Sequence, residues 1–277
     1  MEEKQMKLEY IEKYPNLEEY EFNIDKMLSM AKEIGPSMKL YKYRSGNYNS
    51  DSTNYDLQNL KDNKIRFTNI KNFNNPFECK FVCSDIVNSL NEKLDEYKSF
   101  FDIAQKNKQE YIYKAHNKLI EDSSENFLDS LLICSFSECK DNILMWSHYS
   151  NCHKGFCIEY DFSQLIKSKA LVLPVIYSKT VPDIADTSLK NKKRYSSIYT
   201  KSSDWEYEKE WRFILVGDSE GENLRIDKPK AIYLGCNIAK RLEEDLIKIC
   251  KDKEIKCYKA KKDSYEYKLN FEEVLIK

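Results

Sequence analysis

Apolar and polar residues alternate along many short segments of the chain, most of them in its second half. This period of two is typical of strands that bury one face, and short continuous apolar runs predict strands buried on both faces. The segments predicted as strands are 39–44, 65–68, 131–137, 156–160, 171–177, 205–216, 231–234, 255–259 and 265–275. Because helices interrupt these strands only irregularly, the pattern favours an α+β fold with a mainly antiparallel mixed sheet and flanking helices.

Apolar residues three and four positions apart predict helices around these strands. Helices are expected over 142–150 and 239–251, and in one or two pieces over the charged segment 84–122. Another helix is expected between the first two strands, with Ser52 or Thr53 as its N-cap. These helices would cover the faces of the sheet.

The first 35 residues also have a helical pattern, which ends at Gly35-Pro36. Proline cannot continue a helix, so this dipeptide marks a boundary. No Pro- or Ser-rich linker marks a second one. The sequence therefore predicts a helical N-terminal appendage over residues 1–36 and a single α+β domain over residues 37–277.

The composition is that of a chain with a substantial hydrophobic core. Hydrophobic residues make up 41% and charged residues 33% of its 277 residues. The 45 Lys and Arg residues nearly balance the 46 Asp and Glu residues, leaving a net charge of −1. A chain of this charge has no overall field that gathers nucleic acid or an anionic membrane. Any phosphate ligand must therefore be held by a local group of side chains.

The nine cysteines are odd in number and unevenly spaced, which argues against a disulfide framework. Cys79 and Cys83 have a spacing that could bind zinc, but no Cys-x-x-Cys pair exists and the nearest histidines are far along the chain, so no bound metal is expected. The first residues include no apolar signal segment, and no run of about 18 apolar residues occurs. We therefore expect a cytoplasmic protein that does not contact a membrane.

Carboxylates are concentrated in the predicted strand 205–216. Its alternation would place Glu206, Glu208, Glu210 and Arg212 on one face and aromatic side chains on the other. Carboxylates stacked on one face repel each other, so a purely structural strand gains little from them. This run is either a site or a solvated face on which Arg212 pairs with Glu210.

Two further strands end in polar residues. Arg44 ends the strand 39–44, while Ser135 and Ser137 share one face of the strand 131–137. Side chains at strand ends can leave the core and meet a ligand, although the serines could instead cap the next helix and Arg44 could be solvated. We expect Arg44, one of these serines and Glu210 to converge on one cleft.

Six motifs, in a fixed order between residues 39 and 235, resemble the bacterial family of domain of unknown function 2971. They are Tyr41-Lys-Tyr-Arg, Phe73-Asn-Asn-Pro-Phe-Glu, Cys134-Ser-Phe-Ser, Met145-Trp-Ser-His-Tyr, His153-Lys-Gly-Phe-Cys-Ile-Glu-Tyr-Asp and Tyr207-Glu-Lys-Glu-Trp-Arg. The second motif carries Asn75 where the pattern has Asp. This resemblance implies no activity.

The order of an Arg, a Ser-x-Ser strand and a Glu-x-Glu is also similar to the Arg-Ser-Glu arrangement of ADP-ribosyltransferases. That resemblance implies an ADP-ribosyltransferase-like core with NAD as its substrate. Arg44 would hold the NAD phosphates, and Ser135 or Ser137 would support the nicotinamide side. Glu210 would stabilise the ribose as nicotinamide leaves, and Glu208 would act on the acceptor. The acceptor would be a protein or a nucleic acid, as in a toxin or a phage-defence effector.

Three other residues are candidates for holding the nucleotide. Tyr43 could stack on a ring of the nucleotide, His148 could donate to phosphate or act as a general acid or base, and His153 could hold an anion in the turn before a strand. Each could equally be part of the core or of a turn.

Two other functions are consistent with the same residues. In a metal-dependent nuclease or phosphodiesterase, Glu206, Glu208 and Glu210 would bind magnesium together with Asp161 or Glu159. In a non-catalytic nucleotide-binding module, Arg44, His153 and Arg212 would bind phosphate without turnover.

Overall fold

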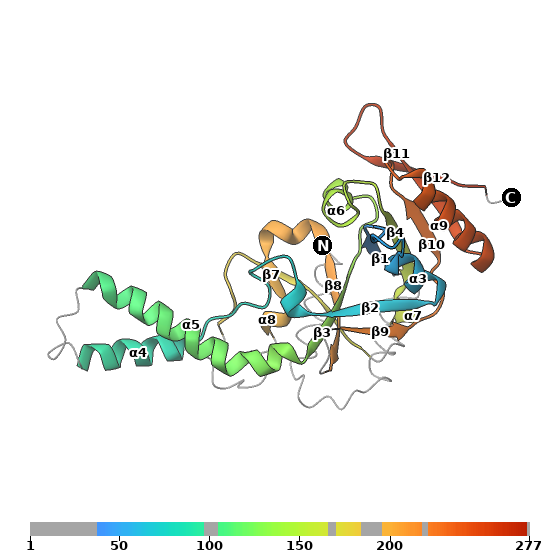
Figure 1. The fold of residues 1–277 in the computed structure, drawn as a ribbon. Helices are drawn as coiled ribbons and strands as arrows, with labels where there is room; N and C mark the ends of the chain where they lie inside the picture. The colour runs from blue at the N-terminus through green and yellow to red at the C-terminus, as the bar shows by residue number, and fades with distance from the viewer. Residues whose placement is uncertain (1–37, 97–104, 166–169, 184–195, 218–220, 276–277) are drawn as a thin grey trace.

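The computed structural model describes residues 38–96, 105–165, 170–183, 196–217 and 221–275 (Figure 1). The predicted appendage over residues 1–36 lies outside these ranges. Within them the molecule is an α+β protein with a mixed, mostly antiparallel sheet and several flanking helices, as the sequence predicts. No helix in these ranges combines the length and the apolar character needed to cross a membrane.

The strands share short lengths of three to seven residues and, for the most part, buried central positions. They are β1 (Lys39–Arg44), β2 (Lys64–Asn69), β3 (Leu131–Ser137), β4 (Phe156–Asp161), β5 (Leu171–Pro174), β6 (Ile176–Ser178), β7 (Thr200–Ser202), β8 (Glu210–Val216), β9 (Gly221–Arg225), β10 (Ala231–Leu234), β11 (Lys256–Lys262) and β12 (Leu269–Glu273). β6 and β7 form a separate parallel pair, and the other ten strands belong to one sheet.

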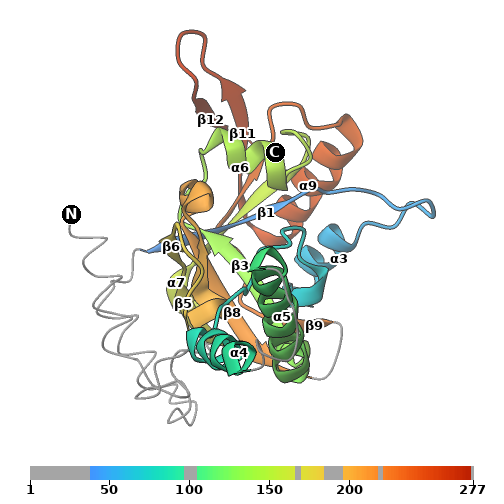
Figure 2. The same ribbon diagram turned by 90° about the vertical axis from the view of Figure 1, so that its left-hand side faces the viewer.

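The helices are short apart from three of 13 residues or more. They are α3 (Tyr55–Lys61), η1 (Ile70–Asn72), α4 (Ser84–Glu96), α5 (Gln105–Asp129), α6 (Ile143–Tyr149), α7 (Phe162–Leu165), α8 (Ser196–Tyr199), η5 (Ser203–Glu208) and α9 (Lys240–Lys253). The α4 and α5 helices lie side by side and extend away from the sheet (Figures 1 and 2). This arm corresponds to the helical pattern predicted over 84–122.

The sheet divides at β3. Along one edge, β3 pairs with β8 throughout its length. Along the other edge, β2 pairs with it at Leu132 and Ile133, whereas β1 meets it only at the pair Tyr41 and Ser137. β1 then continues along β4 for its full length. β1 and β2 therefore diverge from the same edge of β3 and form a fork.

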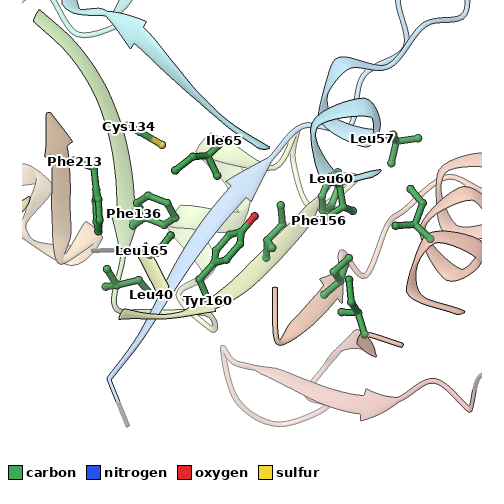
Figure 3. Close-up of a cluster of buried hydrophobic side chains, with 14 of the residues drawn as sticks. Leu40, Leu57, Leu60, Ile65, Cys134, Phe136, Phe156, Tyr160, Leu165 and Phe213 are labelled. Atoms are coloured by element: carbon green, nitrogen blue, oxygen red, sulfur yellow. The ribbon is translucent and has the colours of Figure 1, made fainter. Parts of the chain in front are cut away.

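Three groups of buried side chains hold the two halves of the sheet together. The largest lies between α3, α9 and the strands β1, β3, β4, β8 and β10 and includes Leu40, Phe136, Phe156, Tyr160 and Phe213 (Figure 3). Burying a side chain of this size stabilises the fold by about 1.5–3 kcal/mol. A second group packs α6 onto the opposite face of β1 and β4, and a third packs η1 and α8 onto β3 and β8.

Most predicted elements are present, and several agree with the structure to within two residues. The predicted strands 39–44, 131–137 and 231–234 match β1, β3 and β10 residue for residue. The cap of α3 is Asn54, whose side chain accepts from the backbone N–H of Leu57, and not Ser52 or Thr53.

The single strand predicted over 205–216 is wrong in its first half. Residues Ser203–Glu208 form the 3-10 helix η5, and β8 begins only at Glu210. Between them Lys209 has a left-handed backbone, with φ of 42° and ψ of 56°. Strand alternation therefore does not extend to Glu206 and Glu208, and the four charged residues do not share one face of a strand.

Candidate functional site

A cavity of about 460 Å³ opens in the fork between β1 and β2. Its floor is β3, and its walls include the segment after η1, the end of α6 and the junction of η5 with β8. Lys42 of β1 crosses the fork, where its Nζ donates to the backbone carbonyl oxygen of Ser135 at 2.6 Å. The site therefore lies where the two halves of the sheet separate.

A cluster of buried charges forms one end of this cavity. The Nζ of Lys201, on β7, lies 3.2 Å from Glu78, 2.6 Å from Glu208 and 3.0 Å from Glu210. All four side chains are at most 7% exposed. The left-handed turn at Lys209 lets Glu208 and Glu210 reach the same ammonium group although they belong to a helix and a strand.

Arg212 is a second cation in the same cluster, and its side chain is fully buried. Its Nη2 pairs with Glu78 at 2.5 Å and its Nε with Glu210 at 2.9 Å. Its Nη1 donates to the carbonyl oxygen of Ile198. The pairing of Arg212 with Glu210 expected for a structural strand is thus present, but it is buried and not solvated.

The register of β3 against β8 explains why the serines lie beside these charges. Ser137 is directly opposite Glu210, and Ser135 is directly opposite Arg212. The hydroxyl of Ser137 donates to the backbone carbonyl oxygen of Glu208 at 2.5 Å and accepts from the N–H of Cys139. Ser137 therefore fixes the backbone of the site, whereas the hydroxyl of Ser135 helps to lower the pKa of the Glu210 carboxyl.

The two central carboxylates have opposite acid–base properties. Burial raises the pKa of Glu210, but the positive charges of Arg212 and Lys201 outweigh burial and lower the pKa to about 2. Burial also raises the pKa of Glu208, and there the single cation Lys201 does not overcome it, so the pKa stays above its usual value. Glu208 thus holds a proton more readily than Glu210 does.

Glu208 also receives a hydrogen bond from Tyr149, whose hydroxyl lies 2.5 Å from its Oε1. Burial, followed by the charge of Glu208, raises the pKa of Tyr149. Tyr149 therefore stays protonated and donates. Both oxygens of Glu208 have partners, since Lys201 binds Oε2.

The opposite part of the cavity is cationic. Arg44, at the end of β1, has its Nε 3.6 Å from Asp56, and Arg66 of β2 lines the same space. Arg66 packs on the backbone of Gly221, where an added Cβ would lie 2.5 Å from its Nη2. Together with Lys42, these two guanidinium groups provide donors suited to phosphate.

The structure brings most of the predicted residues to this cavity. Its lining includes Arg44, Tyr43, Ser135, Ser137, His148, Glu208 and Glu210. Tyr43 packs within the protein: its ring lies edge-on against Trp146, and its hydroxyl donates to the carbonyl oxygen of Cys139. His148 is exposed at the rim, with its Nδ1 2.9 Å from the hydroxyl of Tyr207.

His153 lies outside the lining. Its ring stacks on Trp146 and its Nε2 is 3.1 Å from the hydroxyl of Ser147. Its backbone is left-handed, as are those of Asn151 and Cys152 before it, in the turn that closes α6. The geometry thus gives His153 a structural position in this turn.

The structure separates Glu159 and Asp161 from Glu208 and Glu210, the other carboxylates of the magnesium hypothesis. Glu159 pairs with Lys39 and accepts from Tyr233, and Asp161 pairs with Lys230. Neither lines the cavity. Among the described residues, no three His, Cys, Asp or Glu side chains are arranged to hold a metal ion.

The sequence analysis assigned no role to several lining residues that make polar contacts in the site, among them Lys42, Arg66, Glu78, Tyr149 and Lys201. Glu78 and Tyr149 are the last residues of two of the six motifs, so the motifs themselves contained the signal. Lys42 lies inside a third motif. Arg66 and Lys201 belong to none, and only the fold brings them to the cavity.

Comparison with known proteins bears on part of this site. Residues 145–213 match the model of a family described as "Protein of unknown function (DUF2971)". Searches among curated proteins and among solved structures found no match. The matched segment contains Lys201, Glu208, Glu210 and Arg212, while Glu78 precedes it. The part of the chain that carries most of the buried charges is therefore similar to this family, whose description names no activity.

Proposed function

We propose that this protein is an ADP-ribosyltransferase-like enzyme that cleaves the nicotinamide–ribose bond of NAD and transfers ADP-ribose to a macromolecule. The observation that carries the proposal is that one cavity is lined by Arg44 and Arg66 in one part and by Glu208 and Glu210 in another. A dinucleotide offers the matching chemistry, a diphosphate for the guanidinium groups and a ribose that becomes positively charged for the carboxylates.

The charge count of the buried cluster supports this chemistry. Three carboxylates, Glu78, Glu208 and Glu210, surround two cations, Lys201 and Arg212. When all are ionised, one negative charge is in excess. As the C1′–N bond breaks, its electron pair goes to the ring nitrogen of nicotinamide and the ribose gains positive charge. A preorganised negative charge stabilises that transition state more than the ground state.

The opposite pKa shifts of Glu208 and Glu210 suit these two carboxylates to different roles. Glu210, whose pKa lies at about 2, stays ionised and stabilises the ribosyl charge. Glu208, whose pKa is raised, accepts the proton of the acceptor nucleophile as the new bond to C1′ forms. Arg44 holds the diphosphate, and the hydroxyl of Ser135 orients Glu210.

Calorimetry with NAD, followed by a nicotinamide-release assay on the same sample, tests the proposal. We expect Arg44→Gln to weaken NAD binding and Glu210→Gln to reduce nicotinamide release by about a hundredfold or more, on the order of 3 kcal/mol of transition-state stabilisation. Glu272→Gln, on exposed β12, serves as the control and should behave as wild type. Equal nicotinamide release by all of these proteins would exclude the mechanism.

One observation favours a second candidate, a nucleotide-binding module without turnover. Both oxygens of Glu210 already accept from cations, Oε1 from Arg212 and Oε2 from Lys201. A carboxylate held in this way can serve structure alone. NAD binding that releases heat but no nicotinamide, and that Arg44→Gln weakens while Glu210→Gln does not, would support this candidate.

A further inference from the structure

A second cavity, of about 780 Å³, adjoins the first. It is lined by three segments: residues 75–80, residues 178–182 and residues 200–207. His148 and Lys201 line both cavities. We call this second cavity the groove. Because Lys201 binds Glu208, only the side chain of Lys201 separates a molecule in the groove from Glu208, the carboxylate proposed to take the proton of the acceptor.

Aromatic rings dominate the apolar surface of the groove. Phe77 is 65% exposed, which is unusual for a phenylalanine. Trp205 and Tyr207 lie with their ring centroids 6.0 Å apart. Lys201 lies over the Trp205 ring, 5.3 Å from its centroid, and the ring of His148 lies beside it with its centroid at 6.0 Å, so the cation and the rings form one wall of the groove.

The charged groups of the groove are mainly cationic. The Nζ of Lys80 lies over the ring of Phe77, 4.6 Å from its centroid. Neither Lys80 nor Lys179 forms an ion pair with another residue of the described ranges. Asp204 is the carboxylate in the lining, and it accepts from the hydroxyl of Ser202. The groove therefore places ammonium groups beside exposed rings on a molecule of nearly zero net charge.

We propose that this groove binds single-stranded nucleic acid, with a base stacked on the rings and the phosphates beside Lys80 and Lys179. Rings combined with cations along a groove are how proteins hold single strands, because every base has a flat face and every linkage a negative charge. An extended polypeptide carries neither a flat ring nor a negative charge at every repeat. Local cations also provide the attraction that the balanced net charge does not.

Together with the proposed function, on which this step rests, the groove identifies the acceptor as a base of that strand. A ring or exocyclic nitrogen of the base would attack C1′ of the ribose. Nicotinamide would leave with the electron pair of the broken bond, and the proton of the nitrogen would pass to Glu208. The shared lining residues His148 and Lys201 place the two substrates next to each other.

Binding is tested without NAD, so that the groove and the proposed function can fail separately. A 12-nucleotide single strand of mixed sequence, as DNA and as RNA, is titrated into the full chain while tryptophan fluorescence is recorded. Trp146 and Trp211 are buried, so quenching by a stacked base reports on Trp205. We expect quenching with at least one of the two strands, and the stronger binder identifies the nucleic acid.

Variants locate the binding. With a fluorescein-labelled strand, Phe77→Ala should weaken binding by about tenfold, because each stacked base contributes substantially to affinity. Tyr265→Ala, which removes a ring that is 98% exposed in the turn between β11 and β12, is the matched control and should not change it. Trp205→Phe should keep the affinity but abolish the quenching.

The salt dependence counts the phosphate contacts. For single strands the slope of log K against log salt changes by about 0.7 for each contact. Replacing both Lys80 and Lys179 with Ala should therefore reduce the magnitude of this slope by about 1.4. Lys240→Ala on α9 should leave the slope unchanged. Absence of binding to either strand, affinity that Phe77→Ala leaves intact, or equal binding of poly-glutamate would each overturn the proposal.

Discussion

Arg212 and Lys201 hold three carboxylates in a part of the molecule from which water is nearly excluded. Removing an ion from water costs several kcal/mol, and good pairing only offsets this cost. Apolar side chains of similar volume would therefore stabilise this region at least as well. The cluster is better explained by the chemistry of the cavity than by the stability of the fold.

Substituting each central glutamate separates their contributions to stability. Glu210→Gln should lower the free energy of unfolding at pH 7 by about 3 kcal/mol, because it removes one partner of both Arg212 and Lys201. Glu208→Gln should change it by less than about 1 kcal/mol, because Gln still accepts from Tyr149 and the cost of a buried charge disappears. Urea unfolding of both variants measures the difference. Equal losses would show that the two carboxylates are equivalent.

Glu208 and Glu210 should also contribute differently to stability at acidic pH. The folded-state pKa of Glu210 is depressed to about 2 from 4.5, so its contribution is present above about pH 4.5 and is lost as the pH falls towards 2. Glu208 has a raised pKa, so it opposes folding more as the pH rises above 4.5. Stability measured from pH 7 to pH 2 should therefore fall less steeply in Glu210→Gln than in wild type. A steeper fall in that variant would contradict this assignment.

At the scale of elements, the position of β1 in the fork depends on a close contact with the turn before β4. A Cβ added to Gly155 would lie 2.0 Å from the backbone oxygen of Arg44 and 2.9 Å from that of Ser45. Backbone atoms cannot move aside as a flexible side chain can. The glycine in the motif that begins at His153 therefore holds the end of the strand that presents Arg44.

Gly155→Ala should displace this end of β1, lower the free energy of unfolding by about 1–3 kcal/mol and weaken NAD binding. Gly217→Ala is the control, because its Cβ would meet only the side chain of Leu132, at 3.2 Å. Urea unfolding and calorimetry on the same samples give both quantities. If Gly155→Ala matches Gly217→Ala in both, the contact does not position the strand.

The element that sequence patterns misassigned is η5. From Trp205 onward, aromatic and charged residues alternate as they do in a half-buried strand. The pattern therefore predicts that the strand begins at Trp205. The tertiary structure instead caps a 3-10 turn with Ser202, whose hydroxyl accepts from the N–H of Asp204. With this turn in place, Glu208 lies 2.6 Å from the Nζ of Lys201.

At the scale of the whole molecule, the strands of the sheet and the three buried groups that the structure describes lie between residues 38 and 275. A chain that contains its own core folds by itself. We therefore expect residues 37–277 to fold without residues 1–36, with the thermal midpoint and NAD binding of the full chain. Aggregation of the shorter chain, or loss of its cooperative transition, would show that residues 1–36 complete the domain.

The sequence alone determined the α+β class, most of the strands and the residues that carry polar chemistry. These follow from local rules, namely the period of hydrophobic positions, glycine and proline at turns, and motif order. β1, β3 and β10 agree with their predictions because their apolar runs are short and bounded by polar residues. Arg44, Ser135 and Glu210 were recognised because each lies at a strand end or in a motif.

Only the tertiary structure decided how these residues act together. The fork depends on β1 and β2 sharing one edge of β3, which is a long-range pairing without a local pattern. Lys201 is distant in the chain from Arg66 and Glu78, and neither Lys201 nor Arg66 belongs to a motif. The burial of Lys201 and Glu78, and the opposite pKa shifts of Glu208 and Glu210, arise because cations and solvent exclusion are set by packing across the fold.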